Sequence, residues 1–434
     1  MNNRLLKKLS IIASFSLVVS SSFANDLNLE DLIIIALKNN TNIELSKEQS
    51  NIKKEQINKA TSTYLPNLSL NASTARKDIE QEGNKIDDDV NSVAVNANQL
   101  IYDFGKTTSN IDSSKYSYDE SKSDVKATIS KTIFQVTSTY YDILNKYQQI
   151  EVAKESVKLD ELQLNQANEY FKAGVRTKID VTNAKLKLSN SKLKLIQAKY
   201  NLKTTETKLV SLLGKDLGSS INIKFHNKDI TTLVRNTEYK NYSLEKLITL
   251  GLEKRDEIKK YKAKIQTAKE QKNVASADYL PRIDVDASYT NSQSDKIATQ
   301  DIEQSSVALN LKWNFFTGLS TVADNKIALS NLSSAKKQLQ QQILDIKQEV
   351  TSAYLNVKES IDSLNIGLLN VKLATENLSL ADERYKAGLN DLIELNDAKL
   401  EYTQAKSSLV NIYYAYLTNL ANLNYTIGTI HEKI

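Results

Sequence analysis

The chain of 434 residues contains no cysteine, two prolines, two histidines and ten glycines. Without cysteine it has no disulfide, no Cys-ligated metal site, no thiol nucleophile and no N-terminal lipid anchor on cysteine. Two histidines leave little scope for a metal site, and no Gly-rich phosphate loop or Ser-His-Asp pattern is present. We therefore expect no cofactor, no metal and no catalytic site. So few glycines and prolines also leave few breaks, which favours long helices.

Long apolar runs are also missing, except near the N-terminus. Residues 1–24 have a basic end, an apolar stretch and the small-x-small pattern Ser22-Phe23-Ala24, which predict a cleaved signal peptide; an uncleaved anchor is the alternative. The segment holds three basic and no acidic residues, so cleavage lowers the net charge from +5 to +2 (5 − 3). This argues against a nucleic-acid partner. No other stretch approaches the roughly 20 apolar residues of a spanning helix, so a mature protein that crosses a bilayer must use strands.

The sequence is duplicated. The tripeptide Tyr-Leu-Pro ends once at Pro66 and once at Pro281, 215 positions later, and Lys-Ala-Gly recurs at 172–174 and 386–388. A repeat this long indicates a duplicated half rather than a short solenoid unit. The division that follows is a first repeat over 25–213, an equatorial linker subdomain over 214–243 and a second repeat over 244–434.

Each repeat predicts one long helical hairpin. No glycine or proline interrupts residues 106–173, where apolar residues recur at every seventh position, as in a coiled-coil seam. A returning helix follows over about 177–213, and the second repeat places the same pair at 319–387 and 391–427. The seam residues are Ile129, Val136, Ile143, Ile150, Val157, Leu164 and Phe171, then Ile343, Val350, Val357, Leu364, Val371, Leu378 and Tyr385.

A shorter helix opens each repeat, over 28–64 and 244–279. The returning helix is about as long as this opening helix, so the two stacked end to end would match the long helix. The linker subdomain would then lie at mid-height, where the short helices meet.

Two hairpins of strands follow the short helices. Residues 67–76 and 91–103 alternate between polar and apolar around a charged loop at 77–90. In the second repeat the strands are 282–290 and 305–316, around a loop at 291–304. Aromatic residues gather at the strand ends, as they do at membrane interfaces. They are Tyr102, Phe104, Trp313, Phe315 and Phe316.

Four strands of about ten residues suit a tilted crossing of a bilayer but cannot close a barrel. An open sheet edge in lipid is excluded, because unpaired backbone groups there cost several kcal/mol each. The strands would therefore pair with those of other chains, and three chains give twelve strands, enough for a barrel with an open lumen. A soluble sheet packed on the helices is the alternative.

The helix tips carry a resemblance to a known family. The pattern there is an aromatic residue, a glycine three positions on, an acidic-hydrophobic pair and an alanine. With the duplicated halves and Tyr-Leu-Pro before each strand hairpin, the whole mature chain resembles the TolC family of outer-membrane channel-tunnels. The matching residues are Phe171, Gly174, Asp180, Val181 and Ala184 at the first tip and Tyr385, Gly388, Glu394, Leu395 and Ala398 at the second.

The resemblance implies a mostly helical fold with a membrane β-barrel contribution. It implies a homotrimer with a twelve-strand barrel in outer-membrane lipid and a twelve-helix periplasmic tunnel. It also implies docking onto a periplasmic adaptor protein and an inner-membrane transporter of the ABC or RND type. The hairpin tips that would dock are Gly174, Val175, Gly388 and Leu389.

The family's periplasmic gate matches only in part. Glu394 and Asp397 match two acidic residues that ring the entrance in relatives, and threefold symmetry would give six carboxylates that favour cations. Acidic residues near a helix start also interact well with the macrodipole, which is the alternative. Asp180 matches the acidic partner of a closing arginine, but Asn390 stands where that arginine would be. Tyr385 matches the tip aromatic that could bond across helices, or it is the last seam residue.

The predicted function is a passive exit duct for type I protein secretion or multidrug efflux, driven by the partner pump. A non-porous periplasmic coiled-coil scaffold or trimeric adhesin is the rival hypothesis. Such a scaffold would need neither the two lipid-length strand hairpins nor two tight helix tips. An enzyme is the third possibility, and the sequence offers no site for one.

Overall fold

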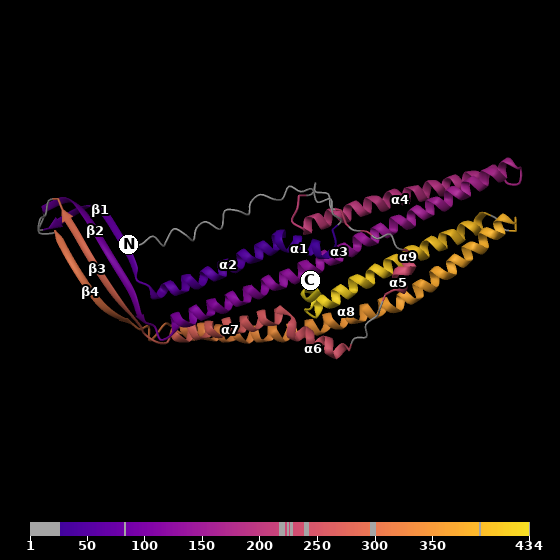
Figure 1. Ribbon diagram of the computed structural model, residues 1–434. Coiled ribbons are helices and arrows are strands. Elements are labelled where there is room, and N and C mark those ends of the chain that lie inside the picture. Colours follow the sequence, from indigo (N-terminus) through magenta and orange to yellow (C-terminus); the bar gives the residue numbers. More distant parts are fainter. Residues whose placement is uncertain are drawn as a thin grey trace, which may run out of the picture.

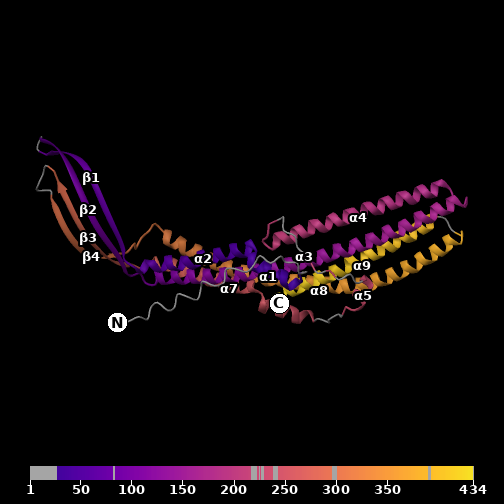
Figure 2. The same ribbon diagram turned by 45° about the horizontal axis from the view of Figure 1, so that its top comes forward.

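The fold is described from a computed structural model of the chain (Figure 1). It covers residues 27–81, 84–216, 222–223, 225, 229–237, 243–295, 301–389 and 392–433. The predicted signal peptide, residues 1–24, lies outside the described residues. The molecule is elongated, with a four-stranded sheet at one end and the tips of two helical hairpins at the other (Figures 1 and 2).

Two very long helices run from the sheet to the tips. α3 (Lys106–Lys172) and α8 (Ser320–Lys386) have 67 residues each, about 100 Å at 1.5 Å per residue. Their returning partners are α4 (Lys178–Leu212) and α9 (Leu392–Thr426), and every end lies within one residue of the prediction. The heptad seams are buried at most positions, which confirms the helical hairpins. Phe171 differs, being 45% exposed at the first tip.

The opening helix of each repeat is broken, so the prediction of one continuous helix was wrong. Asn40 breaks the first, and Arg255, 215 positions later, breaks the second. Both residues have extended backbone. The pieces are α1 (Leu29–Asn39), α2 (Thr41–Thr61) and the 3-10 turn η1 (Ser62–Tyr64), and then α6 (Leu244–Lys254) and α7 (Asp256–Ala277).

Side chains, rather than glycine or proline, hold these breaks. The Asn40 carboxamide accepts hydrogen bonds from the Asn42 and Ile43 amides and donates to the Leu212 carbonyl at 2.7 Å. The Arg255 guanidinium is buried and pairs with Glu257 and Glu349. Because the breaking residue is polar in one repeat and charged in the other, the hydrophobic pattern does not show it.

The broken helices meet the returning helices end to end, as the helix lengths predicted. Gly214, just after α4, has φ +65, and a Cβ there would lie 2.1 Å from the carbonyl oxygen of Asn39. Gly428, just after α9, has φ +73 and lies against Lys254 and Arg255. Only glycine combines this left-handed backbone with so close an approach.

The four strands form one antiparallel sheet with the order β1-β2-β3-β4. The β2–β3 pairing joins the two repeats, with Asn98 opposite Asp286. β1 and β4 form the edges of the sheet within the chain. The strands are β1 (Asn67–Gln81), β2 (Asn84–Tyr102), β3 (Arg282–Ser294) and β4 (Ile302–Lys312).

The strand limits correct the prediction of long polar loops. Most of residues 77–90 continue the ladder, with Lys77 opposite Asp88 and Asp78 opposite Asp87. Backbone hydrogen bonds between two strands do not require apolar side chains, so the charged sequence did not end the pairing. β4 likewise begins and ends earlier than the predicted 305–316, which leaves the aromatic cluster just beyond its end.

Residues directly opposite each other in an antiparallel pair lie on the same face of the sheet. By this rule, one face of the sheet is apolar and the other is polar. The apolar face extends along about six residues of each strand, which is roughly 20 Å. Most of its large side chains are exposed, and Val307 is 79% exposed. The apolar face comprises Leu68, Leu70, Ala72, Val93, Val95, Ala97, Ile283, Val285, Ala287, Tyr289, Val307, Leu309 and Leu311, and the other face includes Asn67, Ser69, Asn71, Asn96, Asn98, Asp284, Asp286, Ser288, Ser306 and Asn310.

The predicted linker subdomain, 214–243, is described only in part. Its short helix α5 (Ile230–Arg235) packs on α8 and α9, with Ile230 and Val234 in the core. Leu27 pairs with Ile223 in an isolated parallel bridge. The chain ends with the 3-10 turn η3 (Ile430–Lys433). Among the described residues, none of the helices is both long and apolar enough to cross a membrane.

Candidate gate at the helix tips

The two helix tips have the same backbone geometry. At the first tip, the Val175 amide donates to the Tyr170 carbonyl at 2.9 Å and the Gly174 amide to the Phe171 carbonyl at 3.0 Å. This pair of bonds is the Schellman motif, with glycine in the left-handed conformation at φ +73.

The second tip repeats the motif. The Leu389 amide donates to the Arg384 carbonyl and the Gly388 amide to the Tyr385 carbonyl. Val175 and Leu389, the residues after the two glycines, are both highly exposed. Each hairpin therefore presents an apolar side chain at its extreme end.

Asp180 acts on its own helix. Its Oδ2 accepts hydrogen bonds from the Thr177 amide at 3.0 Å and the Thr177 hydroxyl at 2.9 Å, as part of a capping box. Asn390, which stands at the position of the closing arginine of relatives, lies outside the described residues. The assignment of Asp180 and Asn390 to the gate therefore stays a prediction.

Tyr385 is buried at the end of the seam in α8 and is only 1% exposed. It packs in a small core with Leu392 and Leu395, and its ring lies 6.0 Å from that of Tyr170 and 5.3 Å from the Arg176 guanidinium carbon. Within the described part of the chain, its hydroxyl has no hydrogen-bond partner. Burial raises the pKa of this hydroxyl. Tyr385 thus joins the two tips by ring contacts.

Glu394 and Asp397 lie near the start of α9 and are both exposed. The buried residues Leu395 and Ala398 follow each of them directly, so the two carboxylates lie away from the seam. An Oε1 of Glu394 is 3.4 Å from Nε of Arg384 in α8, a pair that the sequence did not predict. Arg384 directly precedes the tip aromatic Tyr385 in the sequence. This position is the sequence signal that could have predicted its pairing with Glu394.

A polar seam that the sequence analysis missed joins the two hairpins where α3 contacts α9. Gln163 of α3 donates to Oδ1 of Asn396 at 3.0 Å, and Nζ of Lys399 donates to Oε1 of Gln163 at 2.6 Å and to the Leu159 carbonyl at 3.1 Å. Burial lowers the pKa of Lys399 to about 8. The heptad pattern of apolar residues carries no signal for these polar contacts.

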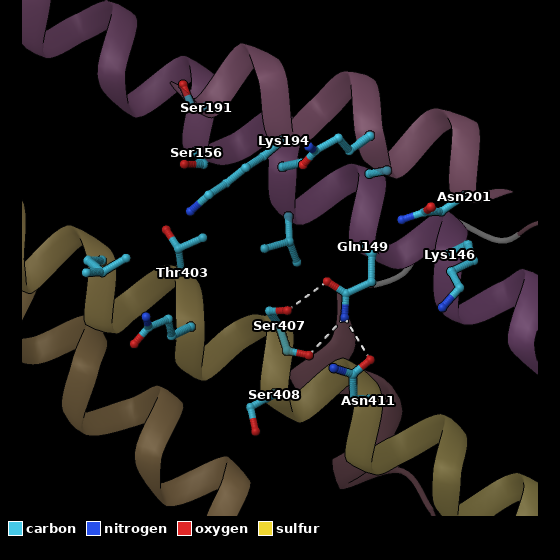
Figure 3. A pocket seen from close by; sticks show the side chains of 16 residues that line it. Lys146, Gln149, Ser156, Ser191, Lys194, Asn201, Thr403, Ser407, Ser408 and Asn411 are labelled. Carbon is cyan, nitrogen blue, oxygen red and sulfur yellow. Dashed lines mark hydrogen bonds between the residues drawn. The ribbon is translucent and has the colours of Figure 1, made fainter. Parts of the chain in front are cut away.

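The seam continues away from the tips and borders a groove. The Gln149 amide nitrogen donates to the Ser407 carbonyl and to Oδ1 of Asn411, and its oxygen accepts from the Ser407 hydroxyl, as the close view of the groove shows (Figure 3). The cavity there has a volume of about 580 Å³. Its polar lining, shared by α3, α4 and α9, includes Lys146, Ser156, Ser191, Lys194, Asn201 and Thr403.

Paired helical hairpins with glycine-capped tips, attached to a sheet with one exposed apolar face, define a class of elongated protein whose sheet suits a membrane and whose helices extend far from it. The model of the family "Outer membrane efflux protein" matches residues 32–215 and 247–429, one match for nearly the whole of each repeat, and the chain belongs to this family. It is an outer-membrane protein and an exit duct.

Individual relatives are distant but long matches. Outer membrane protein TolC of Salmonella enteritidis is 23% identical, with 98% of this chain and 87% of the relative covered. The crystal structure of the Campylobacter jejuni CmeC outer membrane channel has a TM-score of 0.81 at 19% identity and covers 93% of this chain and 86% of that one. Alkaline protease secretion protein AprF of Pseudomonas aeruginosa is 24% identical, covering 42% of this chain and 38% of its own length.

Proposed function

We propose that this chain forms the homotrimeric exit duct of a tripartite export system for type I protein secretion or multidrug efflux. The duct is passive and performs no catalysis. An inner-membrane transporter supplies the energy and acts through a periplasmic adaptor. Residues 214–243 form a lateral subdomain at mid-height.

The sheet carries this proposal. Its large apolar side chains are exposed on one face, and its edges β1 and β4 have no partner strand in the described chain. In lipid the exposed face is stable, but the open edges are not. Pairing β4 of one copy with β1 of the next closes the sheet, and three copies give twelve strands.

The helices support the same closure. Across the protomer the order is α4, α3, α9 and α8, because α3 packs on α4 and on α9, and α9 packs on α8 (Figure 1). Each outer helix exposes apolar residues at heptad spacing, and Tyr200 of α4 is 68% exposed. A stripe of this kind on each edge suits packing of α4 on α8 of the next copy. The stripes are Ile179, Leu186, Leu193 and Tyr200 on α4 and Ile366, Leu373 and Leu380 on α8.

The tips form the entrance in this proposal. In a trimer, Glu394 and Asp397 contribute six carboxylates around one axis, which attract cations and slow anions. Pairing with Arg384 weakens the contribution of Glu394, so Asp397 carries more of the field. The exposed Val175 and Leu389 are the apolar contacts offered to the adaptor. Asp180, Asn390 and Tyr385 remain the candidate residues that hold the entrance closed.

Single-channel recording in planar bilayers tests the duct and the gate together. The detergent-purified mature protein is compared with a Glu394→Gln/Asp397→Asn double variant. We expect small cation-preferring channels, and a weaker cation preference in the double variant. Glu169→Gln is the matched control. It removes an exposed carboxylate that also lies near a tip, but this carboxylate is on α3, is paired with Lys172 and is not part of the proposed ring.

The outcomes separate the hypotheses. Channels with unchanged ion preference in the double variant keep the duct and reject the carboxylate ring. Absence of channels from folded trimers rejects the duct and favours the non-porous scaffold. A monomer in mild detergent rejects the proposed closure.

A further inference from the structure

The groove between α3, α4 and α9 is hollowed by small side chains. Alanine or serine stands at six of the positions that line it, so the three helices leave a cavity of about 580 Å³ where they come together. These positions are Ala153, Ser156, Ser191, Ala198, Ser407 and Ser408. A second cavity of about 320 Å³ shares part of this lining and continues the groove towards the tips. Cavities of several hundred Å³ can hold a small molecule.

The groove is basic. Of the sixteen described residues that line the larger cavity, two are lysines, Lys146 and Lys194, and none is an aspartate or a glutamate. The smaller cavity adds Lys187 and Lys399 and a single carboxylate, Asp160. Four cations therefore face one anion along the groove, in a chain whose basic and acidic residues are nearly equal in number, 57 and 52. A surface of this kind attracts solutes of negative charge.

Lys194 is the cation that the groove offers most directly to a ligand. Its side chain points from α4 into the groove, towards α9 (Figure 3). Lys192, two residues earlier, instead pairs with Glu161 at 3.2 Å. Lys146 is compensated in part, because Asp142 lies 3.3 Å from its ammonium, one turn earlier on α3. The amides and hydroxyls around Lys194 add hydrogen-bond donors for carboxylate oxygens.

The groove opens away from the short helix α5. On α3, Gln149, Ala153 and Ser156 line the groove, whereas Glu151 and Glu155 line a cavity beside α5. At 3.6 residues per turn, these two sets lie roughly 150° apart around α3. In the proposed duct, α5 belongs to the lateral subdomain outside the helical wall. The groove therefore faces the lumen, once in each of the three copies.

We propose that this groove is a luminal binding site for small polyanionic solutes, such as those with two or more carboxylates, on their way through the duct. The inference rests on the proposed function, because the duct is what places the groove in the lumen. Along α9, the groove runs from the level of Thr403 to that of Asn411, 6 and 14 residues beyond Asp397 (403 − 397 and 411 − 397), or about 9 and 21 Å. These distances exceed the Debye length of about 8 Å in physiological salt, so the entrance carboxylates oppose binding only weakly.

Isothermal titration calorimetry of the detergent-purified protein with benzene-1,3,5-tricarboxylate tests the site. The neutral benzene-1,3,5-trimethanol has the same ring and substitution pattern and is the matched ligand control. We expect the tricarboxylate to bind with a Kd below about 1 mM, more weakly as the salt concentration rises, and the triol not to bind. Binding of both ligands, or of neither, would overturn the proposal.

Substitutions on α4 separate the groove from the general charge of the helix. Lys194→Met removes the ammonium and keeps an apolar stem, so the affinity should fall about tenfold. Lys194→Glu places a carboxylate in the groove and should abolish binding. Lys192→Met makes the same change on the same helix but outside the lining, and it should bind like the unmodified protein. An equal loss in Lys192→Met and Lys194→Met would reject the groove as the site.

Planar-bilayer recording tests the luminal position. Added on the side of the helix tips, the tricarboxylate should reduce the current of the unmodified protein and of Lys192→Met reversibly, and about tenfold more should be needed for Lys194→Met. Binding in the calorimeter without any reduction of current would reject a luminal site. If the unmodified protein forms no channels, the proposed function fails. If it conducts but the tricarboxylate neither binds nor reduces the current, only the binding site fails.

Discussion

Replacing the glycine at each helix junction by alanine tests the end-to-end stacking of the short helices. Gly174, Gly214 and Gly428 all have left-handed backbone, with φ between +65 and +73. Their surroundings differ. A Cβ at Gly174 would meet nothing within 4 Å, one at Gly428 would lie 3.0 Å from Lys254, and one at Gly214 would lie 2.1 Å from the Asn39 carbonyl oxygen. The three sites therefore form a graded series with the same backbone strain.

The magnitudes follow from these contacts. Gly174→Ala carries only the left-handed backbone penalty, about 1 kcal/mol. Gly214→Ala adds about 1–3 kcal/mol for displacing backbone in a packed site and about 1 kcal/mol for the bond from Asn40 to Leu212, about 3–5 kcal/mol in total. Gly428→Ala should fall between them.

Thermal unfolding in detergent, followed by circular dichroism, measures the series. We expect Gly214→Ala to lower Tm by roughly 5–10 °C and Gly174→Ala by about 2 °C. Equal shifts for Gly174→Ala and Gly214→Ala would refute the close approach of α4 and α1. If Gly214→Ala does not fold, the expected larger loss of Tm in Gly428→Ala than in Gly174→Ala still tests the close approach of the helix ends.

Two further predictions concern the membrane interface and the polar seam between α3 and α9. Trp313 is the single tryptophan of the chain and is exposed just beyond β4. In vesicles, its fluorescence should be quenched strongly by lipids brominated near the headgroup and little by aqueous acrylamide. The reverse pattern would reject the assignment of the aromatic residues to the membrane–water interface. The second prediction concerns pH. Burial lowers the pKa of Lys399 to about 8, below the 10.5 of an exposed lysine. The contact of Lys399 with Gln163 and Leu159 therefore carries the full cost of burying a charged ammonium below pH 8, and this cost is lost as the pH rises towards 10.5. Raising the pH from 7 to about 9.5 should raise the Tm of the unmodified protein relative to that of Lys399→Met; an identical pH response in that variant would contradict the assignment.

The long helices could be predicted to within one residue because their determinants are local. A proline-free run with an apolar residue at every seventh position, interrupted by no glycine in the first repeat and by Gly367 alone in the second, has few alternatives to a coiled coil. A glycine at each tip then fixes where the chain reverses. The breaks at Asn40 and Arg255 could not be predicted in the same way. Their causes are a side-chain cap and the ion pair of the buried Arg255 with the half-exposed Glu349, which bring together residues far apart in sequence.

The candidate site shows the same limit. The tip glycines and the exposed positions of Glu394 and Asp397 follow from sequence spacing. The bonds of Gln163 and Lys399 do not, because they join residues 236 positions apart on helix faces that look solvated in the sequence. The strand extensions over 77–90 were missed for a related reason, since backbone pairing holds them despite their charge.

The protomer thus contains two kinds of helix contact with different consequences for movement. Within each hairpin, α3 packs on α4 and α8 on α9 through apolar seams, whose separation exposes hydrophobic surface to water and has no compensating partner. Between the hairpins, α3 and α9 meet through hydrogen-bonded side chains such as Gln149, Gln163 and Lys399, interspersed with apolar side chains such as Val152. Water can hydrogen-bond the polar groups equally well, so separating this contact costs less than opening a seam that is apolar throughout. Because Glu394 and Asp397 lie on the same two turns of α9 as Asn396 and Lys399, a shift of this contact moves the two carboxylates with it.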